Sequence, residues 1–141
     1  MATSEIDRIV QVAWEARRRS YSPYSGFAVG AAVLSAKGKV YSGTNIENAS
    51  YGLTVCAERV AIHSAAASGE REIAILAVVA EAEGFATPCG ACRQVLHEFR
   101  LGANGDEQQE TLVVIENGKG ERLVLTLEEL LPHPFALDKP F

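Results

Sequence analysis

The three cysteines of this chain occur in a pattern that suits a catalytic metal site. Cys56 begins the segment Cys-Ala-Glu, and Cys89 and Cys92 lie further along in the segment Pro-Cys-Gly-Ala-Cys. A closed structural zinc site takes four protein ligands, whereas a catalytic site takes three and keeps one position for water. The sequence contains three cysteines in all. It therefore predicts one zinc ion with Cys56, Cys89 and Cys92 as its ligands and one open position.

Glu58 lies two residues after the first predicted ligand. There a carboxylate could reach a water molecule in the open position without binding the metal itself. A glutamate in this place can take a proton from the water and pass protons to the substrate and the leaving group. A lone Cys-x-x-Cys pair also occurs in redox motifs and in structural zinc sites. The added Cys-x-Glu segment favours a hydrolytic site of the zinc deaminase type, in its all-cysteine form.

Arg59 is the residue that we expect to offset the charge of the thiolates. Three thiolates and one zinc(II) sum to a negative charge, which weakens the metal as a Lewis acid. Arg59 comes three residues after Cys56, so on a helix it shares the same face and could hydrogen-bond the sulfur atoms from outside the ligand set. The alternative is an ordinary surface ion pair. Arg93 is the weaker candidate, because its position next to Cys92 turns it away.

Composition and charge narrow the class of protein. The chain has 141 residues, 48% of them apolar and 22% charged, with a formal net charge of −5. This size and composition indicate one globular domain over residues 1–141. The acidic balance argues against binding nucleic acid through phosphate neutralisation. No segment reaches the roughly 18 to 20 apolar residues that span a bilayer, and no secretory signal is present. We therefore expect a cytoplasmic protein with reduced thiols.

The elements that must position these residues follow from periodicity and turn signals. Ser4 is expected to cap a helix that ends near Arg19. Thr54 is expected to cap a helix over 55–68 that stops at Gly69. Thr87 is expected to cap a third helix, which has Pro88 at its first position and ends at about residue 99. Strands are predicted over 28–35, 39–46, 73–80, 111–116 and 121–126, and a last short helix over 127–131.

This order of elements predicts an α/β fold, a three-layer α/β/α sandwich with a five-stranded mixed sheet. The turn at 117–120 is so short that the last two strands must be antiparallel neighbours. Both cysteine segments fall at predicted helix N-termini, where the helix dipole and free N–H groups stabilise thiolates.

Five segments make the chain resemble the small homotetrameric cytidine deaminases over almost its whole length. They are YSPYSGFAVGAA (21–32), GTNIENASYG (43–52), CAER (56–59), PCGACRQ (88–94) and ELLPHPF (129–135). The resemblance implies the cytidine-deaminase-like fold and one zinc ion per subunit. It also implies hydrolytic deamination of cytidine and 2′-deoxycytidine to uridine and 2′-deoxyuridine in pyrimidine salvage, by a homotetramer with pockets shared between subunits. Neither a nucleic acid nor a membrane is expected as a partner.

The same resemblance assigns roles on the sugar side of a nucleoside. Asn45 and Glu47 would hydrogen-bond the ribose hydroxyls, chiefly the 3′-hydroxyl. Side chains at alternate positions near the end of a strand project in the same direction, which supports this pairing. The alternative for both is a polar turn. Phe27 would pack on the nucleoside, with ordinary core packing as the alternative.

On the base side, the backbone N–H of Ala57 would hold the carbonyl at position 2, and Glu58 would also contact ring nitrogen 3. The carbonyl of Thr87 or Pro88 would accept from the exocyclic amine. Phe135 would stack on the base from a neighbouring subunit, again with core packing as the alternative. Tyr51 resembles a position that completes another subunit's pocket.

Three other functions remain open from the sequence. A deaminase of a cytosine-bearing antibiotic such as blasticidin shares the zinc segments, although the intact Asn-Ile-Glu-Asn segment favours an unmodified ribose. An enzyme that edits RNA or DNA is disfavoured by the acidic charge and the lack of a basic, aromatic-lined track. A non-catalytic zinc module would have no use for Glu58. The polar stretch 102–110 is expected to be an enlarged surface loop.

Overall fold

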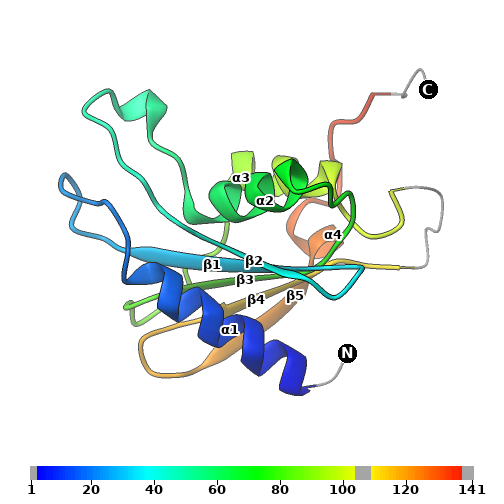
Figure 1. Ribbon diagram of the computed structural model, residues 1–141, viewed down its shortest axis with the longest axis horizontal. Coiled ribbons are helices and arrows are strands. Elements are labelled where there is room, and N and C mark those ends of the chain that lie inside the picture. Colours follow the sequence, from blue (N-terminus) through cyan, green and yellow to red (C-terminus); the bar gives the residue numbers. More distant parts are fainter. Residues whose placement is uncertain (1–2, 104–108, 138–141) are drawn as a thin grey trace.

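The computed structural model describes residues 3–103 and 109–137, which form a five-stranded sheet with helices on both faces (Figure 1). The strands are β1 (Val29–Ser35), β2 (Val40–Thr44), β3 (Ile73–Ala80), β4 (Leu112–Glu116) and β5 (Arg122–Thr126). The helices are α1 (Thr3–Arg17), the 3₁₀ helix η1 (Tyr51–Leu53), α2 (Ala57–Ala67), α3 (Gly90–Glu98) and α4 (Leu127–Leu130). The predicted order of strands and helices is confirmed.

The strand order across the sheet is β2-β1-β3-β4-β5. β3 and β4 are parallel, and every other neighbouring pair is antiparallel, including β4 with β5. The predicted mixed sheet with antiparallel last strands is therefore confirmed. All eight residues of β3 are buried, as expected for a central strand covered on both faces.

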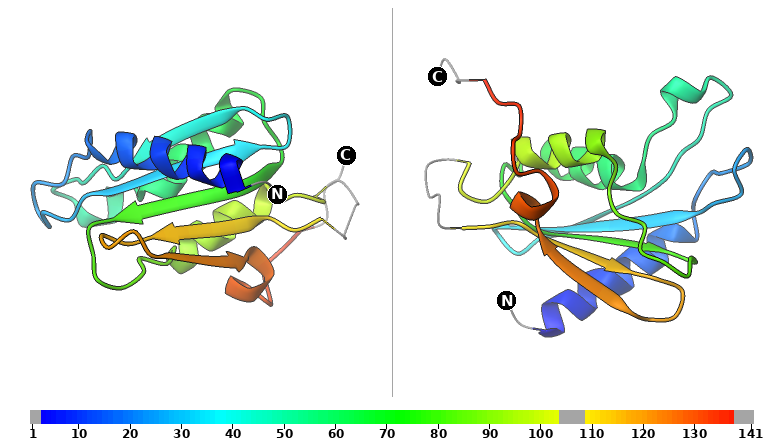
Figure 2. Two further views of the ribbon diagram at one scale, coloured as in Figure 1. Left: turned by 90° about the horizontal axis from the view of Figure 1, so that it is seen from below. Right: turned by 180° about the vertical axis from the view of Figure 1, so that it is seen from behind.

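Helices cover both faces of the sheet (Figure 2), and an apolar cluster on each face explains these three layers. On one face α1 packs through Ile9 and Ala13 against residues that include Ala32 and Val79. On the other face α2 and α3 pack against Ala31 and neighbouring residues of the sheet. Successive residues of β1 and β3 point to opposite faces, so each strand supplies both clusters.

The topology brings the starts of α2 and α3 to the same edge of the sheet. β2 and β3 each pair antiparallel with β1, so they run in the same direction and end at the same edge. The chain leaves β2 through residues 45–56 to begin α2, and it leaves β3 through residues 81–89 to begin α3. Two segments that are far apart in the sequence therefore meet there.

Gly43 of β2 lets α2 lie close against the sheet. A Cβ atom at Gly43 would come within 2.6 Å of the carbonyl oxygen of Ala57 and would also collide with the backbone nitrogen of Ala61. Both atoms belong to the backbone of α2, which cannot move aside as a flexible side chain can. The absence of a side chain at Gly43 thus sets the separation of α2 from β2.

The starts of α2 and α3 differ from the sequence prediction. The hydroxyl of Thr54 accepts from the backbone of Asn48 instead of capping α2. Val55 remains extended because its backbone exchanges two hydrogen bonds with Ile46. Cys56 is therefore the N-cap of α2. In the same way Cys89, and not Thr87, is the N-cap of α3.

Other predicted boundaries shift by one or two residues. α1 begins at Thr3 and ends at Arg17, so Ser4 lies inside the helix instead of capping it. β2 ends at Thr44 because Asn45 and Ile46 bond to Tyr21, Val29 and Val55 outside the regular ladder. α2 ends at Ala67, one residue before the predicted end, and Gly69 follows its C-cap with a φ of 100°. Part of the predicted loop over 102–110, namely 104–108, lies outside the described residues.

Across the described part of the chain, none of the helices has the length and apolar character needed to cross a membrane.

Candidate metal centre and active site

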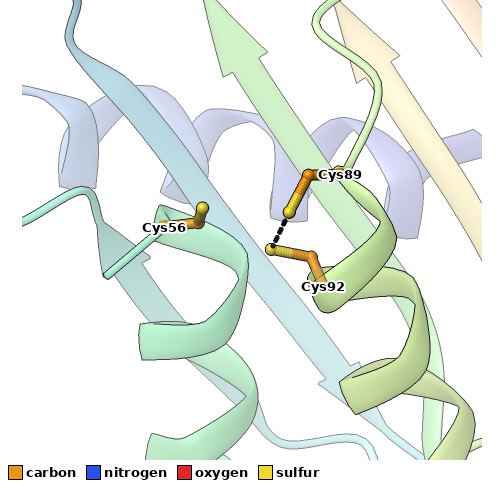
Figure 3. A group of neighbouring side chains, drawn as sticks. All are labelled: Cys56, Cys89 and Cys92. Atoms are coloured by element: carbon orange, nitrogen blue, oxygen red, sulfur yellow. Dashed lines mark hydrogen bonds between the residues drawn. The ribbon is translucent and has the colours of Figure 1, made fainter. Parts of the chain in front are cut away.

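Two helix N-termini, those of α2 and α3, bring the three cysteines together (Figure 3). Cys56 caps α2 with φ −70° and ψ 151°, and Cys89 caps α3 with φ −68° and ψ 170°. Cys92 lies one turn into α3 and faces Cys89, with 3.5 Å between the two sulfur atoms. Each N-cap cysteine places its sulfur at the positive end of a helix, where negative charge is stabilised.

The three sulfur atoms have a spacing that fits one zinc ion. They all lie within 4.8 Å of one another, and two sulfurs on a tetrahedral zinc at about 2.3 Å each would be about 3.8 Å apart. Within residues 3–103 and 109–137, no other group of three or more histidine, cysteine or acidic side chains is close enough to hold a metal. Cys92 is buried, Cys56 is half-buried and Cys89 is exposed. The cluster can therefore hold one zinc ion and reach substrate from the exposed side.

One thiol of the cluster is already strongly acidic. The pKa of Cys56 is lowered to about 5, first by the hydrogen bond from Cys92 and then by Arg59, although burial opposes this. The pKa of Cys92 is raised, because its proton is held by the Cys56 sulfur and its surroundings are buried. The cluster thus combines a stabilised thiolate with a thiol that donates to it.

Arg59 lies beside the sulfur atoms, on the face of α2 expected from the sequence. Its Nη2 donates to the sulfur of Cys56 at 3.4 Å, and this bond is the largest cause of its raised pKa. Its Nε is buried and has no hydrogen-bond partner among the described residues. Arg93 points elsewhere, since it donates to the carbonyl oxygens of Pro88 and Leu130, each at 2.8 Å.

Glu58 is a buried carboxyl group next to the cysteine cluster. Its side chain and backbone together are only 6% exposed. Burial raises the pKa of Glu58, and the negative charge on Cys56 raises it further. A carboxyl group whose pKa is raised in this way is suited to hold a proton and then give it up, as a general acid–base catalyst must.

Asn45 is 8% exposed and is held by three hydrogen bonds. Its Oδ1 accepts from the Ser20 hydroxyl at 2.6 Å and from the Val29 backbone at 2.9 Å. Its Nδ2 donates to the carbonyl of Phe27 at 2.8 Å. Since an amide nitrogen carries two protons, one donor remains for a ligand.

Glu47 accepts three hydrogen bonds from the neighbouring loop. Its Oε1 accepts from the backbone N–H groups of Tyr24 and Ser25 at 3.0 and 3.1 Å, and its Oε2 accepts from the Ser25 hydroxyl. These bonds lower the pKa of Glu47, the Ser25 hydroxyl contributing most. A carboxylate has about four acceptor sites, so Glu47 retains one for a ligand.

The aromatic residues singled out by the sequence are exposed and do not belong to the core. Phe27 is 43% exposed, Phe135 66% and Tyr51 77%. The ring of Tyr51 packs edge-on against Tyr24, with 6.2 Å between the ring centres. An open cavity of about 410 Å³ lies between this aromatic pair and Glu47. The core-packing alternative for Phe27 and Phe135 is therefore wrong for this structure.

Three supporting side chains, Ser20, Ser25 and Gln94, were not singled out by sequence reasoning. Ser20 and Ser25 hold Asn45 and Glu47, as described above. Gln94 holds the backbone of Phe135, donating from Nε2 to its carbonyl at 2.8 Å and accepting from its N–H at 3.3 Å. Ser25 and Gln94 lie inside the segments that carry the resemblance, but serine and glutamine have too many ordinary uses to be assigned from type alone.

Comparison with known proteins adds family evidence to this geometry. Residues 3–104 match the family model described as "Cytidine and deoxycytidylate deaminase zinc-binding region". The cytidine deaminase of Sporosarcina psychrophila is 43% identical over 132 residues, which cover 94% of this chain and 92% of that protein. The cytidine deaminase of Halalkalibacterium halodurans is 44% identical over 130 residues, with 92% and 93% covered.

Solved structures also show that the chain is similar to cytidine deaminases. The crystal structure of cytidine deaminase from Burkholderia pseudomallei superposes with a TM-score of 0.83 at 44% identity and covers 96% of this chain and 100% of that chain. The cytidine deaminase from Mycobacterium tuberculosis gives a TM-score of 0.75 at 36% identity, with 94% and 98% covered.

Proposed function

Because the chain belongs to the cytidine deaminase family, we propose that it hydrolyses cytidine and 2′-deoxycytidine to uridine and 2′-deoxyuridine with release of ammonia, in pyrimidine salvage. This proposal rests mainly on one observation. Three cysteine sulfurs lie within 4.8 Å of one another at the starts of α2 and α3, and the buried carboxyl group of Glu58 lies in the first turn of α2. This arrangement combines a metal-binding group with a proton carrier, as hydrolytic deamination requires.

Cys56, Cys89 and Cys92 are the proposed zinc ligands. When bound, zinc supplies the Lewis acidity that makes a water molecule a nucleophile near neutral pH. The low pKa of Cys56 favours its thiolate form, which binds zinc, and the N-termini of α2 and α3 stabilise negative charge at the cluster. Arg59, which donates to Cys56 at 3.4 Å, offsets part of their negative charge.

Glu58 moves the protons of the reaction. In the proposed mechanism it takes a proton from the attacking water as the oxygen bonds to carbon 4 of the pyrimidine, and it gives that proton to ring nitrogen 3. It then carries the proton of the new hydroxyl to the amino nitrogen, and the carbon–nitrogen bond breaks to release ammonia. Burial, which raises its pKa, suits a group that must both accept and donate.

Asn45 and Glu47 are proposed to bind the ribose, chiefly at the 3′-hydroxyl. After their internal bonds, Asn45 has one N–H donor left and Glu47 has one acceptor site left. A hydroxyl group can accept one hydrogen bond and donate another at the same time. It therefore complements these two groups.

The base would lie between backbone groups and aromatic rings. The N–H of Ala57, in the first turn of α2, would donate to the carbonyl at position 2, since such groups have no partner within the helix. The carbonyl of Thr87 or Pro88 would accept from the exocyclic amine; that of Pro88 already accepts from Arg93. Phe27 would pack on the nucleoside.

We further propose that the chain acts as a homotetramer, in which Phe135 stacks on the base in a neighbouring subunit and Tyr51 helps to complete a neighbouring pocket. The exposure of both rings supports this arrangement, because large apolar groups at a surface often mark protein interfaces.

Residues 1–141 would act as a single deaminase domain, since β4 and β5 lie beyond the matched family region yet extend the same sheet. The three free thiols favour a cytoplasmic location.

An ultraviolet assay of the zinc-loaded protein tests the proposal. Cytidine and deoxycytidine are expected to be deaminated, whereas free cytosine and blasticidin S are expected to remain unchanged. Turnover of blasticidin S alone would assign the chain to antibiotic deamination instead. Turnover of no compound, with zinc bound, would exclude nucleoside deamination.

Glu58→Gln tests the proton carrier in the same assay. It should lower kcat by at least about a hundredfold, since general acid–base catalysis typically contributes that much or more, while zinc content stays at one per chain. Glu5→Gln, an exposed change on α1, is the control and should leave kcat unchanged. Full activity of Glu58→Gln with zinc in place would contradict the role of Glu58.

A further inference from the structure

We infer that Ser25 is a positioning residue that joins the carboxylate of Glu47 to the backbone of Phe27 and so arranges the sugar side of the site before substrate binds. The inference rests on the proposed function, in which Glu47 accepts from a ribose hydroxyl and Phe27 packs on the nucleoside. Ser25 itself need not touch substrate for this role.

Ser25 makes contacts in two directions. Its hydroxyl donates to Oε2 of Glu47 and accepts from the backbone N–H of Phe27 at 3.0 Å. Its own backbone N–H donates to Oε1 of Glu47 at 3.1 Å. Ser25 therefore contacts both oxygens of the Glu47 carboxylate, and its hydroxyl is the atom that links Glu47 to Phe27.

The backbone around Ser25 is shaped for this link. Gly26 follows with a φ of 70°, which favours glycine, and its N–H donates to the carbonyl of Ser22 at 2.9 Å. The resulting turn brings the N–H of Phe27 back to the Ser25 hydroxyl, two residues earlier, as serine side chains do in turns. The turn and the carboxylate 22 residues away are thus held as one unit.

The link also determines what Glu47 offers to a ligand. With three donors on the loop side, the carboxylate cannot rotate freely, and its remaining acceptor site is on Oε2, which has one donor while Oε1 has two. The Ser25 hydroxyl is also the largest cause of the lowered pKa of Glu47, so the group stays ionised and accepting. Without this hydroxyl, Glu47 would lose its hydrogen bond to Oε2, and the backbone N–H of Phe27 would lose its partner.

Steady-state kinetics of Ser25→Ala test the inference. KM for cytidine should rise about tenfold, equal to about 1.4 kcal/mol, which is near the lower end for hydrogen bonds to charged groups. The change in kcat should stay below about twofold, because lost ground-state binding raises KM alone. With 3′-deoxycytidine, which lacks the hydroxyl that Glu47 is proposed to bind, Ser25→Ala should change KM much less.

Two variants serve as controls. Ser25→Thr keeps the hydroxyl and should restore KM for cytidine. Ser64→Ala removes an exposed hydroxyl from α2, and it should behave like the wild type. Equal KM changes for cytidine and 3′-deoxycytidine, or no difference between Ser25→Ala and Ser64→Ala, would overturn the inference.

A measurement without turnover separates this inference from the proposed function. Carboxyl NMR of Glu47 should show a pKa below its ordinary value in the wild type and a higher pKa in Ser25→Ala, with both proteins folded. Failure of the wild type to deaminate any nucleoside would refute the proposed function but leave this comparison intact. An unchanged pKa of Glu47 in Ser25→Ala would refute the positioning role.

Discussion

Cys56, Glu58 and Arg59 lie within four consecutive residues, yet each meets the cysteine cluster in a different way. Cys56 caps α2 and contributes a sulfur, and Arg59, three residues later on the same face, donates to that sulfur at 3.4 Å. Glu58 lies between them with its carboxyl group buried. The proposed metal ligand, the proposed proton carrier and a cation that contacts the ligand sulfur thus all lie at the start of one helix.

Removal of the Arg59 guanidinium should weaken zinc binding. Arg59→Gln is expected to lower zinc affinity about tenfold or more, since partners that bond to ligands typically contribute 10- to 100-fold. Competition with a chromophoric chelator measures this directly, without activity. Arg18→Gln changes an exposed arginine that pairs with Glu15 on α1, and it should leave the affinity unchanged. Equal affinities for both variants would show that Arg59 does not support the site.

At the scale of elements, the site depends on how closely α2 approaches the sheet. Cys56 is the first residue before α2, so a shift of that helix moves its sulfur relative to Cys89 and Cys92 on α3. The close contact of Gly43 with the backbone of Ala57 and Ala61 sets this position. The metal centre is therefore sensitive to a residue that carries no functional group.

A methyl group at Gly43 should disturb both stability and the metal centre. Gly43→Ala is expected to cost about 1–3 kcal/mol in the free energy of unfolding, as overpacking usually does, and to lower zinc affinity. Thermal unfolding and chelator competition measure the two effects. Gly84→Ala is the matched control, because a Cβ there would meet no atom within 4 Å. A Gly43→Ala protein as stable as the Gly84→Ala protein would contradict the close approach of α2.

At the scale of the whole molecule, Phe135 is held in place but left uncovered. Gln94 fixes its backbone with two hydrogen bonds, while the residue remains 66% exposed. An ordered but exposed aromatic ring is suited to enter a site on another subunit. This fits a tetramer in which neighbouring chains share pockets.

Mixing two inactive variants tests the shared pocket. Glu58→Gln lacks the proton carrier and Phe135→Ala lacks the aromatic ring, and each alone should have low activity. Mixed tetramers should regain part of the wild-type rate, because a site with Glu58 from one chain can receive Phe135 from a neighbour. Each variant refolded alone is the control. Activity no greater than that of the separate variants would show that Phe135 acts within its own chain or not at all.

Much of the fold could be predicted because its signals are local. The apolar run at 73–80 predicted β3 to the residue, and the short turn at 117–120 predicted the antiparallel pair of β4 and β5. The starts of α2 and α3 were wrong by two residues. At α2, bonds from Asn48 and Ile46 to the segment before Cys56 override the local capping preference.

By itself, the sequence determined the residue types of the site and the order of the elements that carry them. Cysteine spacing, hydrophobic periodicity and turn residues depend on neighbours in the chain, so they can be interpreted without a structure. Only the tertiary structure decided how these residues are held. Ser25 meets Glu47 across 22 residues and Gln94 meets Phe135 across 41. Such contacts depend on which strands pair and where the loops cross, and no local pattern encodes that.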